Sequence, residues 1–245
     1  MEQEFSTGTD TGRVRPHNED TVGVKRLPTA DRPGLYIVAD GMGGHKSGDV
    51  ASKLAVNTVL REFDNHASQD YHGWLRRTLE TANQVVYQYN VTLESNMGTT
   101  LVAALVIGLE IHLAHVGDSR AYLISGDQIW QITNDHSVVK ELLRAGAITP
   151  EVAEHHPSKH MLTQAIGLDE TVHVESSLIS AQPGDYLVLC SDGLSNEVTD
   201  EQLLTIVNGA HSADEACEQL MNAADQAGAH DNVTVIVVQL KEKEG

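Results

Sequence analysis

Cysteine and basic residues are both scarce in this chain, and each shortage argues against a class of protein. The 245 residues include only two cysteines, which is too few for a disulfide framework. The 16 Lys and Arg face 35 Asp and Glu, which gives a formal net charge of −19. Nucleic-acid phosphates need a basic surface, so this charge argues against nucleic-acid binding. We expect the reducing cytoplasm as the compartment.

Long apolar runs and linkers are missing as well. The longest apolar stretch, residues 101–109, is far too short to span a bilayer, and we expect no membrane partner. The N-terminus begins Met1-Glu2-Gln3-Glu4, which is acidic and unlike a signal peptide. No proline- or glycine-rich linker divides the chain, whose length suits one large core. We therefore expect a single domain over residues 1–245, acting as a monomer.

The hydrophobic pattern predicts a mixture of helices and strands. Helical periodicity covers residues 49–63 and 74–93, and further helices are predicted over 200–207 and 213–227. Strands are predicted over 21–25, 35–39, 99–107, 111–116, 121–125, 128–131, 172–177, 186–190 and 233–240. Short turns join the strands between 99 and 131 into antiparallel meanders. Paired helices before and after a run of strands fit two packed sheets with helices outside.

Five aspartates stand at turns or strand ends, and several have glycine beside them. They are Asp20, Asp40, Asp118, Asp192 and Asp231. Asp40, Asp118 and Asp192 follow apolar runs that predict buried strands, so each can be held rigidly and still reach a cleft. Carboxylates without Cys or His partners suit hard cations such as magnesium or manganese. A plain turn would explain Asp20 or Asp118 taken alone, but five such residues favour a metal site.

Short motifs surround these aspartates in sequence. They are Arg-x-x-Asn-Glu-Asp from Arg15, Asp-Gly-Met-Gly-Gly-His from Asp40, Gly-Thr-Thr from Gly98, Gly-Asp-Ser-Arg from Gly117, Asp-His-Ser from Asp135, Leu-Thr-Gln-Ala-Ile-Gly from Leu162, Ser-Asp-Gly-Leu from Ser191 and Asp-Asn-x-Thr from Asp231. This succession resembles the metal-dependent Ser/Thr protein phosphatases (the PPM, or protein phosphatase 2C, family) in their compact bacterial form. Each motif is weak alone, whereas the ordered set covers nearly the whole chain.

The resemblance implies an α+β fold, an αββα sandwich with metals between the sheet ends and a flap subdomain over about 136–167. It also implies the metal ligands. Asp40 would bridge two Mn²⁺ or Mg²⁺ ions, and the carbonyl of Gly41 would bind the second. Asp192 and Asp231 would complete the first site. Asp20, helped by Glu19 through water, would serve the second, and a weaker third ion would use Asp118 with Asp192.

The same resemblance implies the reaction, which is hydrolysis of phosphoserine and phosphothreonine in proteins by a metal-activated bridging water. The protein would act in signalling, and its partners would be phosphorylated proteins and a cognate Ser/Thr kinase. Arg15 is the expected phosphate clamp and a catalytic residue with Asp40 and Asp192, because a planar guanidinium matches phosphate oxygens. Arg13, interpreted as lying on the same strand face, competes, but the spacing to Asn18-Glu19-Asp20 favours Arg15.

The general acid and the roles of several histidines and hydroxyl groups are less clearly indicated by the sequence. The eukaryotic branch of the family has a histidine directly after Asp-Gly, proposed there as the general acid, whereas this chain has Met42. His45 lies nearby, but loop histidines are more often structural, so the acid stays unassigned. The histidines around residues 155–160 show no regular zinc-ligand spacing. The hydroxyls of Gly98-Thr99-Thr100 are expected to serve the backbone, and Asp135-His136-Ser137 to fix a loop.

The motifs of other protein classes are incomplete in this sequence or do not fit it. A P-loop needs glycine directly before Lys-Ser, where His45 stands. A cysteine-dependent tyrosine phosphatase needs arginine six residues after the thiol, and neither cysteine has it. A non-catalytic regulator of the same fold should lack some ligand aspartates, whereas all five are present. A general phosphohydrolase of small esters stays open, because the ligands do not distinguish it.

Overall fold

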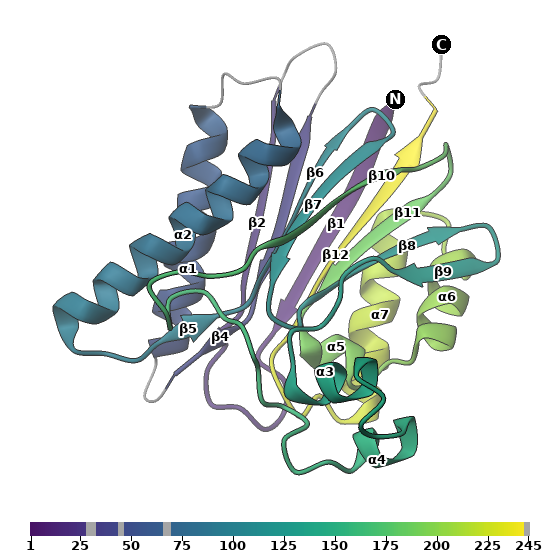
Figure 1. The fold of residues 1–245 in the computed structure, drawn as a ribbon. Helices are drawn as coiled ribbons and strands as arrows, with labels where there is room; N and C mark the ends of the chain where they lie inside the picture. The colour runs from purple at the N-terminus through teal and green to yellow at the C-terminus, as the bar shows by residue number, and fades with distance from the viewer. Residues whose placement is uncertain (28–32, 44–46, 66–69, 243–245) are drawn as a thin grey trace.

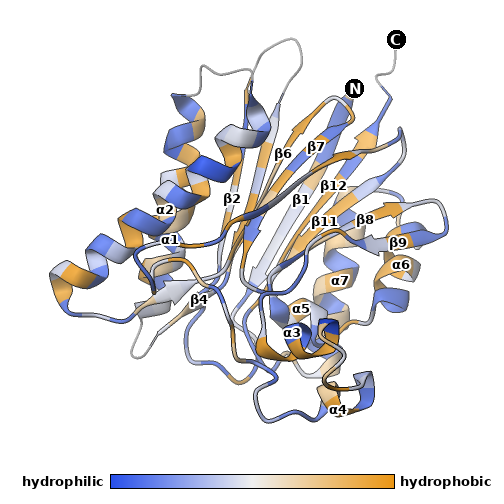
Figure 2. Ribbon diagram, in the orientation of Figure 1, coloured by the Kyte–Doolittle hydropathy of each residue, from blue (hydrophilic) through white to orange (hydrophobic). Residues whose placement is uncertain are grey.

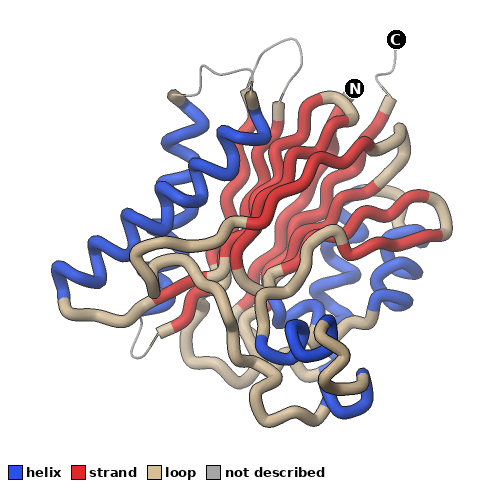
Figure 3. The backbone as a smooth tube through the Cα atoms, viewed as in Figure 1, coloured by secondary structure: helices blue, strands red, loops and turns tan. Residues whose placement is uncertain are grey.

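Two five-stranded β-sheets lie face to face, with helices on the outer side of each (Figure 1). The structure, a computed structural model, describes residues 1–27, 33–43, 47–65 and 70–242. Figure 3 shows the four layers as helix, strand, strand and helix. The predicted α+β sandwich is confirmed.

The first sheet has the strand order β1-β12-β11-β8-β9, and every neighbouring pair is antiparallel. Its strands are β1 (Glu2–Asp10), β12 (Val233–Lys241), β11 (Tyr186–Cys190), β8 (Arg120–Ser125) and β9 (Gln128–Gln131). The second sheet has the order β10-β7-β6-β3-β2, again antiparallel. Its strands are β10 (Glu175–Ser180), β7 (Glu110–Val116), β6 (Leu101–Ile107), β3 (Gly34–Ala39) and β2 (Thr21–Arg26). A ribbon of β4 (Gly41–Met42) and β5 (Gly98–Thr99) extends from the second sheet's end.

Within the described ranges, the helices form two outer pairs and three short single helices. The pair α1 (Ser47–Asp64) and α2 (Tyr71–Leu93) covers the second sheet, and α6 (Asp200–Gly209) with α7 (Ala213–Ala227) covers the first (Figure 1). The short helices α3 (Val138–Arg144), α4 (Pro150–Glu154) and α5 (Asp192–Ser195) gather near one end of the sheets. Among the described residues, no helix is long and apolar enough to cross a membrane.

Alternating side chains along each strand fill three apolar layers. On β11, Leu187 and Leu189 face the layer between the sheets, whereas Tyr186, Val188 and Cys190 face α6 and α7. Strand β3 behaves likewise between the inter-sheet layer and the α1–α2 layer. Both faces of these strands are therefore buried, which explains their nearly continuous apolar sequence. Figure 2 shows apolar strands inside and polar helix faces outside.

The structure differs from the predicted elements mainly at the edges. Strand β1 was not predicted, because Glu2–Asp10 is largely polar and lies at a sheet edge, where nine registered pairs with β12 define it. The predicted strand over 99–107 is interrupted at Thr100, whose N–H donates to the carbonyl of Asp40 at 2.8 Å. The strand predicted over 172–177 starts only at Glu175. Arg13 and Arg15 lie in the loop after β1, so the expectation of one strand face was wrong.

The layer between the sheets should dominate stability. Leu187 is fully buried there, whereas Leu178 on β10 is 54% exposed. We expect Leu187→Ala to lower the free energy of unfolding by about 2–5 kcal/mol, because it removes buried methyl groups and leaves a cavity. Leu178→Ala is the matched control and should change it little. Urea denaturation measures both, and equal losses would contradict the assigned layers.

A carboxylate cleft at the sheet ends

A cleft of about 660 Å³ is lined by residues from both halves of the sandwich. Six of the seven predicted site residues line it, namely Arg15, Asp40, Gly41, Asp118, Asp192 and Asp231. The seventh, Asp20, is only 8% exposed and does not line the cleft. The tertiary structure thus gathers residues spread over more than two hundred positions of the chain.

Strand ends bring the aspartates together. Asp40 directly follows β3, and Asp192 opens α5 two residues after the end of β11. Asp231 lies two residues before β12, which pairs antiparallel with β11, so the end of β11 and the start of β12 are neighbours. Asp118 lies two residues after β7, behind Gly117, whose φ of +100° favours glycine. All four carboxylates therefore sit at one end of the two sheets.

Asp20 lies in the protein behind the cleft, on a hydrogen-bonded bridge between the sheets. The hydroxyl of Ser191 donates to Asp20 Oδ2 at 2.8 Å and accepts from the N–H of Thr234 at 3.0 Å. The other oxygen, Asp20 Oδ1, is buried without a hydrogen-bond partner, and so is Asp192 Oδ1. Buried carboxylate oxygens without donors are unusual, and here they mark unused ligand capacity.

Burial and mutual repulsion raise the pKa values of the clustered aspartates. Burial, followed by neighbouring carboxylates, raises the pKa of Asp118 to about 7. Burial likewise raises the pKa of Asp20 to about 7, with repulsion from Asp192 and Asp231 adding to it. The pKa of Asp40 lies well above its ordinary range, again through burial and then the charges of its neighbours. The pKa of Asp192 is also raised. Such a set of oxygen donors fits divalent hard cations, which would neutralise the crowded charge.

The two arginines of the first motif lie apart. Arg15 lines the cleft, and its Nη2 donates to Asp231 Oδ2 at 2.7 Å. Arg13 forms a two-point pair with Asp225 on α7, at 2.7 and 2.6 Å, and does not line the cleft. The side chain of Arg15 is 53% exposed, and its guanidinium has further N–H donors beyond the one bonded to Asp231. Arg15 is therefore the arginine placed to meet a ligand.

Hydroxyl and amide side chains fix the backbone around the aspartates. The N–H of Asp40 donates to Thr100 Oγ1 at 2.9 Å, and the hydroxyl of Thr99 donates to the carbonyl of Asp40 at 2.9 Å. These bonds confirm the predicted backbone role of the threonines. Asn232 accepts from the N–H of Glu19 at 2.8 Å and donates to the carbonyl of His17 at 2.9 Å, which ties the Arg15 loop to Asp231.

Sequence reasoning assigned no role to several residues that the structure places at the site. Ser191 and Asn232 adjoin ligand aspartates in their motifs, which was the available signal. Asn196, one turn along from Asp192, donates to Asp192 Oδ2 at 3.1 Å. Lys159 and His160 line the cleft from the segment after α4, within the range 136–167 that the resemblance assigns to the flap. Met42 also lines it, whereas His45 lies outside the described residues.

The carboxylate cleft has the oxygen donors that divalent cations prefer, and comparison with known proteins gives the family. The sequence profile described as Protein phosphatase 2C matches residues 7–237. The chain is 39% identical to the serine/threonine phosphatase stp of Listeria innocua, over 98% of this chain and 96% of that one. It therefore belongs to the protein phosphatase 2C family.

Solved structures agree with this assignment. The serine/threonine phosphatase Stp1 from Staphylococcus aureus superposes with a TM-score of 0.91 at 37% identity, over 100% of this chain and 96% of that one. The catalytic domain of the phosphatase PstP, in complex with two manganese ions, superposes with a TM-score of 0.84 at 33% identity, over 98% of this chain and 99% of that one. The sandwich is thus shared at nearly full length.

The raised pKa of Asp20 predicts a pH-dependent instability of the metal-free protein. The folded state keeps the Asp20 proton up to about pH 7, whereas an unfolded aspartate loses it near pH 4. The associated stability is complete below pH 4 and lost as pH rises through 7. Asp20→Asn removes this pH-dependent loss. In chelator, the free energy of unfolding of Asp20→Asn minus that of wild type should therefore increase by about 2–3 kcal/mol between pH 5 and pH 8.

Urea denaturation at the two pH values measures the change. Asp127→Asn, in the exposed turn between β8 and β9, controls for the loss of one carboxylate. If the free energy of unfolding of Asp20→Asn differed from that of wild type by the same amount at both pH values, Asp20 would ionise normally in the folded protein.

Proposed function

We propose that the protein is a manganese- or magnesium-dependent phosphatase that hydrolyses phosphoserine and phosphothreonine in proteins. The observation that carries this proposal is the group of crowded carboxylates in and behind the cleft, which have raised pKa values and include two oxygens without hydrogen-bond partners. Membership of the protein phosphatase 2C family, and the names of its relatives, support the substrate class. The two manganese ions of PstP support the metal.

The proposed ligands follow the expected assignment. Asp40 would be shared by both ions, with Asp192 and Asp231 completing the first site. Asp20 and the Gly41 carbonyl would serve the second. Asp118, with Asp192, would hold a third and weaker ion. When bound, such ions would supply an activated water as nucleophile and neutralise the phosphoryl oxygens.

The protein's own side chains would orient the substrate and keep the carboxylates in place. Arg15 would clamp the phosphoryl group with the N–H donors that its pair with Asp231 leaves available. Thr99 and Thr100 fix the backbone of Asp40 through two hydrogen bonds. Asn196 donates to Asp192 and so limits the rotation of that carboxylate. Each of these groups acts without changing its protonation state.

We further propose that residues 1–245 act as one domain, and that the segment 136–167 is its flap. This segment contains α3 and α4 and contributes Lys159 and His160 to the cleft, a position from which it can shape substrate access. The proposed partners are phosphorylated proteins and a cognate Ser/Thr kinase in the cytoplasm. Phosphopeptides and small phosphate esters, assayed side by side, would separate a protein phosphatase from a general phosphohydrolase.

Metal dependence is the first test. With carboxylate ligands alone, we expect phosphopeptide hydrolysis to stop in excess chelator and to return with Mn²⁺. Asp40→Asn and Asp192→Asn should abolish turnover in folded protein, because each removes a charge that two cations share. Asp127→Asn is the control and should keep full activity. Turnover that persists in chelator would contradict the metal mechanism.

Phosphate binding is tested separately. Arg15→Ala should raise KM for phosphopeptide roughly tenfold to a hundredfold, the value of one lost charge-assisted contact, and leave Mn²⁺ affinity nearly unchanged. Arg13→Ala is the matched control, because it breaks only the exposed pair with Asp225. Steady-state kinetics and Mn²⁺ titration measure both effects. A larger change in KM for Arg13→Ala would show that the clamp was assigned to the wrong arginine.

A further inference from the structure

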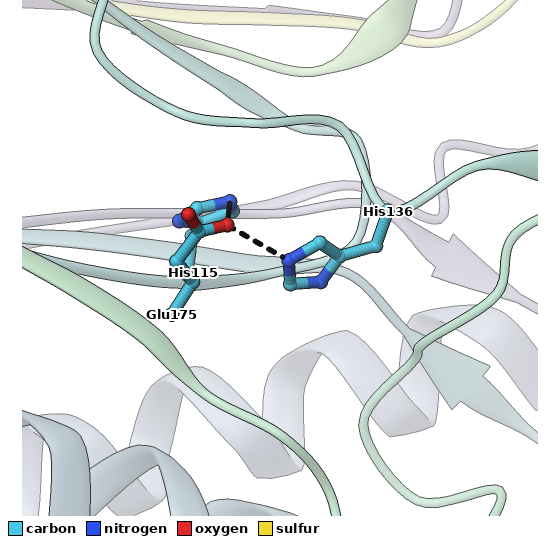
Figure 4. A group of neighbouring side chains, drawn as sticks. All are labelled: His115, His136 and Glu175. Atoms are coloured by element: carbon cyan, nitrogen blue, oxygen red, sulfur yellow. Dashed lines mark hydrogen bonds and ion pairs between the residues drawn. The ribbon is translucent and has the colours of Figure 1, made fainter. Parts of the chain in front are cut away.

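Two histidines and a glutamate form a compact group outside the cleft lining (Figure 4). His115 lies on β7, His136 precedes α3, and Glu175 begins β10 directly opposite His115. Among the described residues, this is the one group of His, Cys, Asp or Glu whose three ligand atoms lie within 4.8 Å of one another. Its chemistry is therefore either that of a metal site or that of a hydrogen-bond network.

The hydrogen bonds of the two rings decide between these alternatives. The N–H of Gly117 points at His136 Nδ1 at 3.2 Å. An amide can only donate, so Nδ1 is unprotonated and the neutral ring carries its proton on Nε2, which faces Glu175 Oε2 at 3.2 Å. His115 Nε2 lies 2.9 Å from the carbonyl of Asn134, which can only accept, so this nitrogen is protonated as well. A metal needs bare nitrogens, so the group is a hydrogen-bond network.

The network ends on the turn that carries Asp118. The N–H of His136 donates to the carbonyl of Gly117 at 3.0 Å, while the N–H of Gly117 donates to the His136 ring. His136 therefore binds both backbone groups of Gly117, the N–H through its ring and the carbonyl through its own backbone N–H. The turn is also closely packed, because a Cβ at Gly117 would meet Thr100 Cγ2 at 2.7 Å. The residue after it, Asp118, reaches the cleft.

The residues after Asp118 are fixed by the same two segments. The hydroxyls of Ser119 and Thr100 share a hydrogen bond of 2.7 Å. Arg120 donates to Asp135, the neighbour of His136, with its shortest contact at 2.7 Å. Asp118 is therefore flanked by Gly117, whose backbone is held by His136, and by Ser119 and Arg120, whose side chains are held by Thr100 and Asp135.

We propose that His136 is a positioning residue for the Asp118 carboxylate. Glu175 orients the imidazole, the imidazole holds the amide of Gly117, and this bond fixes the backbone that presents Asp118 to the cleft. The inference rests on the proposed function, because it assigns Asp118 to that site. His136 also accepts, through its carbonyl, from the N–H of Thr163 at 2.9 Å, so the same residue anchors both the Asp118 turn and the end of the segment 136–167.

Three substitutions at one position separate the parts of this network. In His136→Asn, the side-chain oxygen can occupy the place of Nδ1 and accept from Gly117, but it cannot reach Glu175. In His136→Gln, the amide can reach toward Glu175 and offers no acceptor at the Nδ1 position. His136→Ala removes both contacts. The control is His112→Ala, which deletes a buried imidazole on β7 whose ring nitrogens make no hydrogen bond, to Gly117 or to any other residue described.

The kinetic readout is kcat per folded molecule at saturating Mn²⁺. We expect His136→Ala and His136→Gln to lower it about tenfold to a hundredfold, as for a small displacement of a catalytic group. KM for phosphopeptide should hold, because Arg15 is untouched. His136→Asn should recover most of the rate. A uniform fall in melting temperature, with kcat unchanged in all three, would show a merely structural role and overturn the proposal.

A double-mutant cycle tests whether His136 acts through Asp118. In an Asp118→Ala background, adding His136→Ala should cause no further loss of kcat. Calorimetric Mn²⁺ titration of His136→Ala should resemble that of Asp118→Ala and lack the same weak binding step. The inference would be overturned if the two substitutions together lowered kcat by the product of their separate effects, or if His136→Ala gave the wild-type Mn²⁺ isotherm. An inactive wild type would count against the phosphatase function instead, and the isotherms would still decide the role of His136.

Discussion

Repulsion among buried carboxylates is the constraint on which the rest of this structure depends. Asp20, Asp40, Asp118 and Asp192 all have raised pKa values, first because burial excludes water around them and then because neighbouring carboxylates add negative potential. Left on flexible loops, such groups would separate or turn to solvent. The fold must therefore hold them from outside, by backbone anchors and a rigid core.

The two-sheet core supplies that rigidity, and small polar side chains carry it to the aspartates. Strands β3 and β11 are buried on both faces, so their ends have little freedom to move. Ser191, Thr100 and Asn232 then bind backbone or carboxylate groups directly beside the candidate ligands. Hydrogen bonds of this kind use neutral groups and add no charge to the cleft. The negative charge therefore remains available for cations, which fits the family's metal-dependent chemistry.

Much of the fold could be predicted from the sequence because the relevant signals are local. Tyr186–Cys190 is a short apolar run of the length of a buried strand, and Ala213–Ala227 has apolar residues at helical spacing. Strand β1 shows the limit, since its polar sequence forms a strand only through its pairing with β12. The loop holding Arg13 and Arg15 shows another, because Asn232, more than two hundred residues away, fixes the path of that loop near His17.

The sequence by itself determined the family, the layered α+β class and the set of carboxylates that could bind metal. Short motifs in a fixed order indicate the family, and the family implies the fold class and the candidate ligands. Tertiary structure decided how these groups are used. It paired Arg15 with Asp231 and Arg13 with Asp225, placed Asp20 behind the cleft, and brought His136 against Gly117. These outcomes depend on contacts between segments remote in the chain. Hydrogen-bond direction and burial are properties of such contacts, and residue order alone does not specify them.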